Sequence, residues 1–343
     1  MQLYIQYANK KQFIDSYQDI FETKTEEDVK EFLKKLEYKD WKVSFQYETL
    51  YQAVSNLKDS KFFGKNIESN VKWFYFGNDT CEHLIPTLDE MNDFFKEILK
   101  LNKDPNSSNK KTMTLVTPPV GNFWISKLRT LFDYLQNNVR ESTEVVVNDF
   151  WVLYIINKEY DKLKPILGRL LNKAQRNPLV WDKKENVDPQ VPSFLWKEIY
   201  EKIKNNQYEY YDSNPINLDI FTKSFKKYWI SRFWVDNVGL WLNKEIKNDF
   251  WVDIYYPYAT VAHGRNCATA WIVDKTREWY VQDLPCPRYC QKFDILLKAW
   301  INDKWITQRG NGVWKRHLNL EKIHSTILTN KENRLVFSPF IPV

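Results

Sequence analysis

The stretch of sequence that decides the fold is residues 71–99, VKWFYFGNDTCEHLIPTLDEMNDFFKEIL. It begins at 71–76 with a run of aromatic and β-branched residues, which is typical of a strand. Thr87 and Glu90 follow with the spacing of a helix capping box, and apolar residues recur behind them at helical intervals. The stretch therefore predicts a strand, a short connection and a helix.

Strand and helix alternate in this way from about residue 41 to residue 256. Because parallel strands need helical crossovers, the alternation predicts a parallel sheet with helices outside it. The number of expected strands suits an α/β fold of the TIM-like barrel type, in an incomplete or distorted form, ahead of a doubly wound sheet. The expected strands are residues 41–47, 71–76, 112–117, 144–147, 165–167, 231–234 and 250–255.

The barrel is expected to occupy residues 41–290. Residues 1–40 then form an N-terminal extension, and residues 291–343 form a C-terminal extension that packs on the barrel. Two further strand patterns lie late in the chain: residues 271–283 alternate like a hairpin, and residues 334–337 end the chain as a strand.

Composition excludes several classes of protein. The chain has 343 residues, 43% of them hydrophobic, so it can bury a full core. Its net charge of +6 is not gathered into a basic run, and nucleic acid is therefore not the favoured partner. No signal peptide or membrane-spanning run is recognisable, and the eight glycines form neither a G-x-G-x-x-G nor a Walker loop. A cytoplasmic protein without a membrane partner is expected.

The chemistry that the sequence predicts lies in its four cysteines, Cys81, Cys267, Cys286 and Cys290. Cys81 and Cys267 each come a few residues after a predicted strand. In one parallel sheet both thiols would lie near the carboxyl edge, where α/β folds place their active groups. Cys286 and Cys290, spaced as C-x₃-C, would return over that edge. The four thiols could then converge on one Cys₄ site.

Three interpretations of these thiols compete. Free cysteines are often small buried hydrophobes, although a C-x₃-C pair flanked by prolines is an unusual core segment. Disulfides are disfavoured in a chain without a secretory signal. Structural zinc usually takes two short C-x₂₋₄-C pairs, and this chain has one, whereas iron–sulfur clusters take four thiolates at irregular spacing. The spacing favours an iron–sulfur cluster and does not by itself settle iron against zinc.

Four segments carry a family resemblance: residues 71–81 (VKWFYFGNDTC), 143–156 (TEVVVNDFWVLYII), 164–178 (KPILGRLLNKAQRNP) and 255–270 (YYPYATVAHGRNCATA), with a closing C-x₃-C. Together they resemble the collagenase-like peptidase family of unknown catalytic type (U-32), and within it the UbiV branch. In that branch one cysteine follows the second barrel strand and three more cluster near the end, the last two separated by three residues. The four cysteines of this chain stand in that order.

The resemblance covers about residues 41–290 and implies a TIM-like barrel with an oxygen-sensitive [4Fe–4S] cluster held by Cys81, Cys267, Cys286 and Cys290. It also implies a redox role in oxygen-independent hydroxylation, with a second protein subunit and an electron donor. Genuine peptidase activity is not expected, because no Ser–His–Asp or Cys–His arrangement is recognisable. Two alternatives stay open: a non-catalytic barrel partner with a structural cluster, and an RNA-base-modifying enzyme.

Polar residues near the expected strand ends are candidates for a substrate pocket. They are Asn148, Asp149, Arg169, Tyr258, His263 and Arg265. Arg169 could clamp a carboxylate or phosphate with its planar guanidinium, or it could form an ordinary salt bridge. Asn148 and Asp149 could instead cap the helix that begins at Phe150.

His263 and Arg265 stand just before Cys267 in the sequence. In one interpretation they donate hydrogen bonds beside the cluster, where such donors tune its potential. In the other they belong to a solvated loop.

Overall fold

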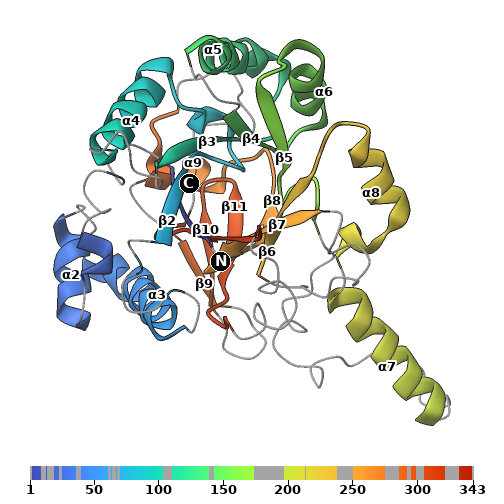
Figure 1. Cartoon of the computed structure of the whole chain (residues 1–343). Helices are drawn as coiled ribbons and strands as arrows, with labels where there is room; N and C mark the ends of the chain where they lie inside the picture. The colour runs from blue at the N-terminus through green and yellow to red at the C-terminus, as the bar shows by residue number, and fades with distance from the viewer. Residues whose placement is uncertain are drawn as a thin grey trace.

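Eight strands pair in parallel and close into a barrel in the computed structural model, with helices around the outside (Figure 1). The order around the barrel is β1-β12-β7-β6-β5-β4-β3-β2. The strands are β1 (Gln2–Tyr7), β2 (Val71–Gly77), β3 (Thr112–Thr117), β4 (Thr143–Val147), β5 (Leu163–Leu167), β6 (Arg232–Asp236), β7 (Trp251–Tyr256) and β12 (Arg334–Phe337). The TIM-like α/β barrel expected from the sequence is confirmed, and the barrel is closed.

The structure describes most of the chain. The described residues are 2–8, 13, 19–22, 25–35, 40–60, 63, 67, 70–102, 110–138, 143–173, 197–212, 214–237, 250–274, 286–291, 295–298, 305–320 and 332–341.

The strands are apolar because both of their faces are buried. On β2, Phe76 points outward and stacks on Phe94 of helix α4 (Leu88–Leu101), with ring centroids 4.2 Å apart. Tyr75, its neighbour on the same strand, points inward and stacks on Trp234 of β6 across the barrel at 5.5 Å. A strand with helices on one face and the barrel interior on the other needs an almost continuous apolar run.

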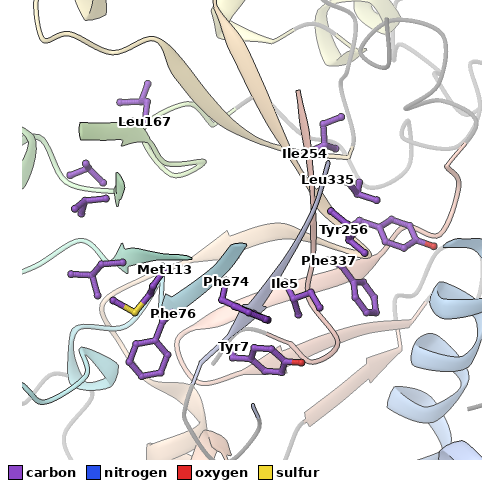
Figure 2. Packing of buried hydrophobic residues seen from close by; sticks show 14 of the residues in the cluster. Ile5, Tyr7, Phe74, Phe76, Met113, Leu167, Ile254, Tyr256, Leu335 and Phe337 are labelled. Atoms are coloured by element: carbon purple, nitrogen blue, oxygen red, sulfur yellow. The ribbon is translucent and has the colours of Figure 1, made fainter. Parts of the chain in front are cut away.

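Successive residues of a strand point alternately outward and inward, so the strands contribute to two large apolar cores. The larger one lies between the strands and the helices, and Figure 2 shows part of it. Its labelled members are Ile5, Tyr7, Phe74, Phe76, Met113, Leu167, Ile254, Tyr256, Leu335 and Phe337. The smaller core fills the barrel interior and continues through its carboxyl end to Cys81 and Cys290.

Side-chain caps mark the start of helices such as α4. In α4 the Thr87 hydroxyl accepts from the Glu90 amide at 3.1 Å and the Glu90 carboxylate accepts from the Thr87 amide at 2.8 Å, which confirms the predicted capping box. The other helices are α2 (Glu26–Lys35), α3 (Asp40–Asp59), α5 (Asn122–Asn138), α6 (Phe150–Glu159), α7 (Lys197–Asp212), α8 (Asp219–Lys226) and α9 (Ala268–Val273). No helix in the described part of the chain is long and apolar enough to cross a membrane.

One of the expected strands is wrong. Residues 41–47 lie inside helix α3, which continues without interruption to residue 59. Adding residues to a formed helix is easy compared with starting one, and no glycine or proline separates 41–47 from the helical pattern behind it. The other six expected strands are barrel strands.

The expected barrel boundaries at residues 41 and 290 are too narrow. β1 comes from the segment expected to be an N-terminal extension, and β12 comes from the expected C-terminal extension. They pair with each other, with Leu3 opposite Leu335, and each pairs with a further barrel strand. The two ends of the chain therefore complete the barrel.

A second, antiparallel sheet lies against the carboxyl end of the barrel. It contains β8 (Tyr258–His263), β9 (Ile295–Lys298), β10 (Trp305–Arg309) and β11 (Gly312–Arg316), in the order β8-β11-β10-β9. β8 begins directly after β7, and Tyr258 and Trp314 join the core that fills the barrel. In Figure 1 the strands of this sheet cross the middle of the ring of barrel strands.

The hairpin expected at residues 271–283 is not found in its first part. Residues 271–273 end helix α9, whose N-cap is Cys267. The Cys267 sulfur accepts from the Ala270 amide, and this local contact starts a helix where the alternating pattern indicated a strand. Residues 275–283 lie outside the described residues.

Paired charges fill the amino end of the barrel interior. Arg334, the first residue of β12, donates to both carboxylate oxygens of Glu144, at 2.6 and 2.9 Å. Arg232, the first residue of β6, donates to Asp253 at 2.7 Å, and Tyr75 donates to the other oxygen of Asp253 at 2.6 Å. Two buried cations thus balance the buried carboxylate of Asp253 and the largely buried carboxylate of Glu144 at this end.

Removing one of these buried cations should destabilise the fold strongly. Arg334→Met leaves Glu144 without its bidentate partner, so we expect the free energy of unfolding in urea to fall by about 3–5 kcal/mol. The control is Arg129→Met, which breaks a surface pair with Glu159 and should change the free energy by less than about 1 kcal/mol. Equal losses in the two variants would contradict a stabilising role for the buried network.

Candidate metal centre at the carboxyl end of the barrel

The four cysteines approach the same end of the barrel from three separate connections. Cys81 follows β2, Cys267 precedes α9, Cys286 stands before a 3₁₀ turn at Tyr289–Gln291, and Cys290 lies within that turn. All four are free thiols. Cys81 is 8% exposed and Cys290 is 4% exposed, whereas Cys267 and Cys286 are partly buried. The fold therefore brings the segments that carry the four thiols to one end of the barrel, and their convergence on one Cys₄ site stays a prediction.

The thiols lie near enough to one another to affect the pKa values of Cys81 and Cys290. Burial raises the pKa of the Cys81 thiol well above its usual value, and the thiols of Cys290, Cys267 and Cys286 raise it further. Burial likewise raises the pKa of Cys290 to about 12, with Cys267 and Cys286 again contributing and Arg309 opposing them. A thiolate at Cys81 or Cys290 would repel a thiolate at the other positions, so burial and this repulsion keep the bare Cys81 and Cys290 thiols protonated.

The turn that carries Cys81 is built by a glycine and an asparagine. Position 77 requires glycine. Its backbone has φ +116°, and a Cβ there would stand 2.4 Å from the carbonyl oxygen of Val116. The side-chain oxygen of Asn78 then accepts from the amides of Thr80 and Cys81, at 2.9 and 2.6 Å. This local hydrogen bonding fixes the direction in which the Cys81 thiol leaves the strand.

The C-x₃-C segment is attached to the outer layer of helices. Arg288, between the two cysteines, has φ +54° and donates to Glu90 of the α4 capping box at 3.0 Å. Its amide donates to the sulfur of Cys286 at 3.4 Å. The segment therefore returns over the strand ends in the way expected from its spacing.

The donor set suits an iron–sulfur cluster. Among the residues that the structure describes, no three His, Cys, Asp or Glu side chains lie close enough to hold a single metal ion. A [4Fe–4S] cluster makes a different demand, because each thiolate binds its own iron and the sulfurs stand further apart than the ligands of one ion. Four thiols with no carboxylate among them are the ligands such a cluster takes.

A buried arginine lies next to the cysteines, inside the mouth of the barrel. Arg169 follows β5 and is 1% exposed; its Nε donates to Asp79 at 2.5 Å and its Nη1 donates to Asp236 at 2.9 Å. Its guanidinium lies 3.9 Å from the ring centroid of Tyr255 and 4.7 Å from that of Trp314. Asp79 stands two residues before Cys81, so the arginine network and the Cys81 thiol share one turn.

Polar atoms of this network remain unused. Arg169 Nη2, Asp79 Oδ1 and the indole nitrogens of Trp234 and Trp314 are buried and make no hydrogen bond within the described chain. The carboxylates of Asp79 and Asp236 together more than offset the charge of the guanidinium. This disfavours the expected clamp on an anionic group and favours the alternative in which Arg169 forms salt bridges within the chain. What remains is a position without excess positive charge that offers both donors and acceptors.

Asn148 and Asp149 have structural contacts at the neighbouring strand ends. The Asn148 amide donates to the Thr117 carbonyl at 2.9 Å, and its oxygen accepts from the Leu170 amide at 3.1 Å. Asn148 thereby positions the turn that carries Arg169. Asp149 is the N-cap of α6, as the capping interpretation held.

The remaining pocket candidates lie along β8 and the loop after it. Tyr258 is fully buried in the core shared with Cys290 and Trp314. His263 is half-buried at the end of β8, and Arg265 is exposed.

Sequence reasoning missed Asp79, Asp236 and Trp314. Asp79 comes just after β2 and Asp236 is the last residue of β6, so the strand-end argument used for Asn148 applies equally to them. Trp314 lies in the segment expected to be an extension, and no local pattern marks it.

Comparisons with known proteins leave the family open. No family model, no curated protein and no solved structure matches this chain.

The buried arginine network predicts an unequal response to substitution. Arg169→Met leaves two buried carboxylates unpaired and should lower the free energy of unfolding by about 3–5 kcal/mol. Asp79→Asn should be milder, because burial raises the pKa of Asp79 above its usual value despite the contact with Arg169, and an amide oxygen can still accept from Nε. Urea unfolding at neutral pH measures both.

Arg265→Met is the control, since this exposed arginine should contribute less than about 0.5 kcal/mol. If Asp79→Asn lowered the free energy of unfolding more than Arg169→Met, Arg169 would not be the group that holds Asp79 and Asp236 together.

Proposed function

We propose that this chain is a [4Fe–4S] protein whose cluster is held by Cys81, Cys267, Cys286 and Cys290. We further propose that it is the redox component of an oxygen-independent hydroxylation or a related modification. The observation that carries the proposal is the meeting of all four cysteines at the carboxyl end of one barrel.

The environment of the thiols favours a metal group over isolated core cysteines. Cys267 and Cys286 are partly exposed, which does not suit small residues that only fill a core. Burial and mutual repulsion keep the bare thiols of Cys81 and Cys290 protonated, whereas the positive charge of a bound metal makes the thiolate the stable form. Binding of the cluster should therefore release protons and stabilise the site.

A cluster with four protein thiolates has no open iron position, so when bound it would transfer electrons rather than bind substrate. Substrate then has to be held by the chain itself. The best-placed groups are Arg169 Nη2, an unused donor, and Asp79 Oδ1, an unused acceptor on a residue that stands two positions before Cys81. They suit a polar group without negative charge, since the carboxylates of Asp236 and Asp79 more than offset the charge of Arg169.

The reaction class rests on the resemblance of the cysteine pattern to the U-32 family, because a barrel fold alone is compatible with many chemistries. The same resemblance is the basis for a second subunit and an electron donor. If the protein bound RNA in a salt-dependent way, the reaction would be the modification of RNA bases.

Exposed apolar side chains on two helices favour a second candidate, a barrel that works as the partner of another protein. Phe150 and Trp151 of α6 are 62% and 56% exposed, and Ile220 of α8 is 77% exposed. Phe150 stacks on the buried Phe225 of α8 at 6.1 Å, so the two helices touch through these rings. Large exposed apolar patches of this kind usually mark protein contacts.

Anaerobic purification with analysis of iron, sulfide and zinc tests the cluster. We expect about four iron and four sulfide per chain, with the visible absorption of an iron–sulfur cluster. Each single cysteine variant should lose most of this iron, because every thiolate holds one iron. The variants are Cys81→Ser, Cys267→Ser, Cys286→Ser and Cys290→Ser.

Arg129→Met, on the outer surface, is the matched control and should keep the full iron content. One zinc and no iron per chain would remove the redox function, and no metal at all would sink the proposed site.

The partner candidate predicts that the α6–α8 face is needed for complex formation. Trp151→Ser combined with Ile220→Ser should abolish retention of a second protein in anaerobic affinity purification. Leu99→Ser is the control, because Leu99 is 61% exposed on α4, away from this face. Retention unchanged in the double variant would reject this surface as the contact.

A further inference from the structure

The turn between β10 and β11 touches every connection that carries a cysteine. It consists of Gly310 and Asn311, with Arg309 paired to Gly312 across the hairpin. Gly310 has φ +63°, which a two-residue hairpin turn accommodates at its first position. The hairpin belongs to the sheet that lies against the carboxyl end of the barrel (Figure 1).

Asn311 joins the connection of Cys81 to that of Cys267. Its side-chain amide donates to the Thr80 carbonyl at 2.6 Å and to the Gly264 carbonyl at 2.7 Å. Its backbone carbonyl accepts from the Gly264 amide at 3.0 Å. A terminal amide offers two donors on one nitrogen, and Asn311 uses both to hold two loops that are distant in sequence.

Its two neighbours make the remaining contacts. The Gly310 amide donates to the hydroxyl of Thr269, in the first turn of the helix that Cys267 caps, at 2.9 Å. Arg309 is fully buried, and its Nε donates to the carbonyl of Cys290 at 2.6 Å. Its Nη1 donates to the Ile341 carbonyl at 3.4 Å.

We propose that Arg309 and Asn311 are positioning residues that assemble the four-cysteine site, with Arg309 also supplying a fixed positive charge beside Cys290. The inference rests on the proposed function for its redox part only. The assembly part concerns the bare chain and stands on the hydrogen bonds of the hairpin turn.

The charge of Arg309 has a direct consequence for a redox group. A guanidinium stays protonated at every accessible pH, so its charge is permanent. Its Nε lies 2.6 Å from the carbonyl oxygen of Cys290, so this buried charge stands beside the residue that carries the thiol. A fixed cation favours the more negative, reduced form of a neighbouring cluster and therefore raises the reduction potential.

The assembly role is tested on metal-free protein with a short bifunctional thiol reagent, followed by peptide mass spectrometry. In the wild-type chain we expect a link between Cys81 and Cys267. Asn311→Ala should reduce its yield about tenfold, the factor that corresponds to a loss of about 1.4 kcal/mol. Asn311→Gln, which keeps both donors, should restore part of the yield.

Gln308→Ala is the matched control, because adjacent strand residues point to opposite faces and Gln308 makes none of these contacts. Circular dichroism confirms that each variant is folded. Asn311→Ala linked as well as the wild type would overturn the assembly role.

The charge role is tested on loaded protein by redox titration. Arg309→Met should lower the reduction potential and speed the loss of iron to a chelator by about 10- to 100-fold, the usual effect of residues that support metal ligands. Arg309→Lys keeps the charge and should hold the potential near that of the wild type, even if the iron is lost faster. Equal potentials in Arg309→Met and Arg309→Lys would overturn the charge role.

These readouts separate the two hypotheses. A wild-type chain that links Cys81 to Cys267 but binds no iron would reject the proposed function and leave the assembly role standing. A wild-type chain that binds a full cluster, with Asn311→Ala binding it equally well, would reject the assembly role alone.

Discussion

Closure of the barrel is the constraint on which the rest of the structure depends. β1 pairs in parallel with both β2 and β12, so the two ends of the chain become neighbours. Closure gathers the carboxyl ends of all eight strands into one ring, and the connections leaving these ends have to meet above it. Asp79 and Arg169 are far apart in the sequence, and Cys81 and Cys267 still more so. They come together because their strands belong to one closed sheet.

The two ends of the barrel interior differ in how their charges are used. At the amino end, Arg232 and Arg334 are matched by Asp253 and Glu144, and the contacts are short and repeated. At the carboxyl end, Arg169 is shared by two carboxylates, and several buried polar atoms are left without hydrogen bonds within the described chain. Buried polar groups are normally satisfied, so the exceptions concentrate where a ligand or ordered water can approach. The amino end stabilises the barrel, and the carboxyl end carries the features of a site.

The late part of the chain has a structural role at that site. Residues after 290 provide β12, which completes the barrel, and β9, β10 and β11, which build most of the second sheet. Trp314 covers Arg169, and the turn at Asn311 holds the loops before Cys81 and Cys267. A short antiparallel sheet suits this position, because its hairpin turn can reach several loops at once while its strands stay fixed by backbone pairing.

The sequence alone determined the class of the fold and the identity of the candidate ligands. Local strand and helix patterns report burial, and they located seven barrel strands, β12 among them, and the capping box of α4, while the cysteine spacing indicated which thiols could meet. The segment 41–47 shows the limit of this reasoning, since a short alternating run fits a strand or a helix until its neighbours decide. Only the tertiary structure decided that β1 and β12 close the barrel, that Arg169 is neutralised by Asp79 and Asp236, and that Arg309 and Asn311 reach the cysteine loops. These are contacts between residues far apart in the chain, and their partners are chosen by barrel closure, which leaves no periodic pattern in the sequence.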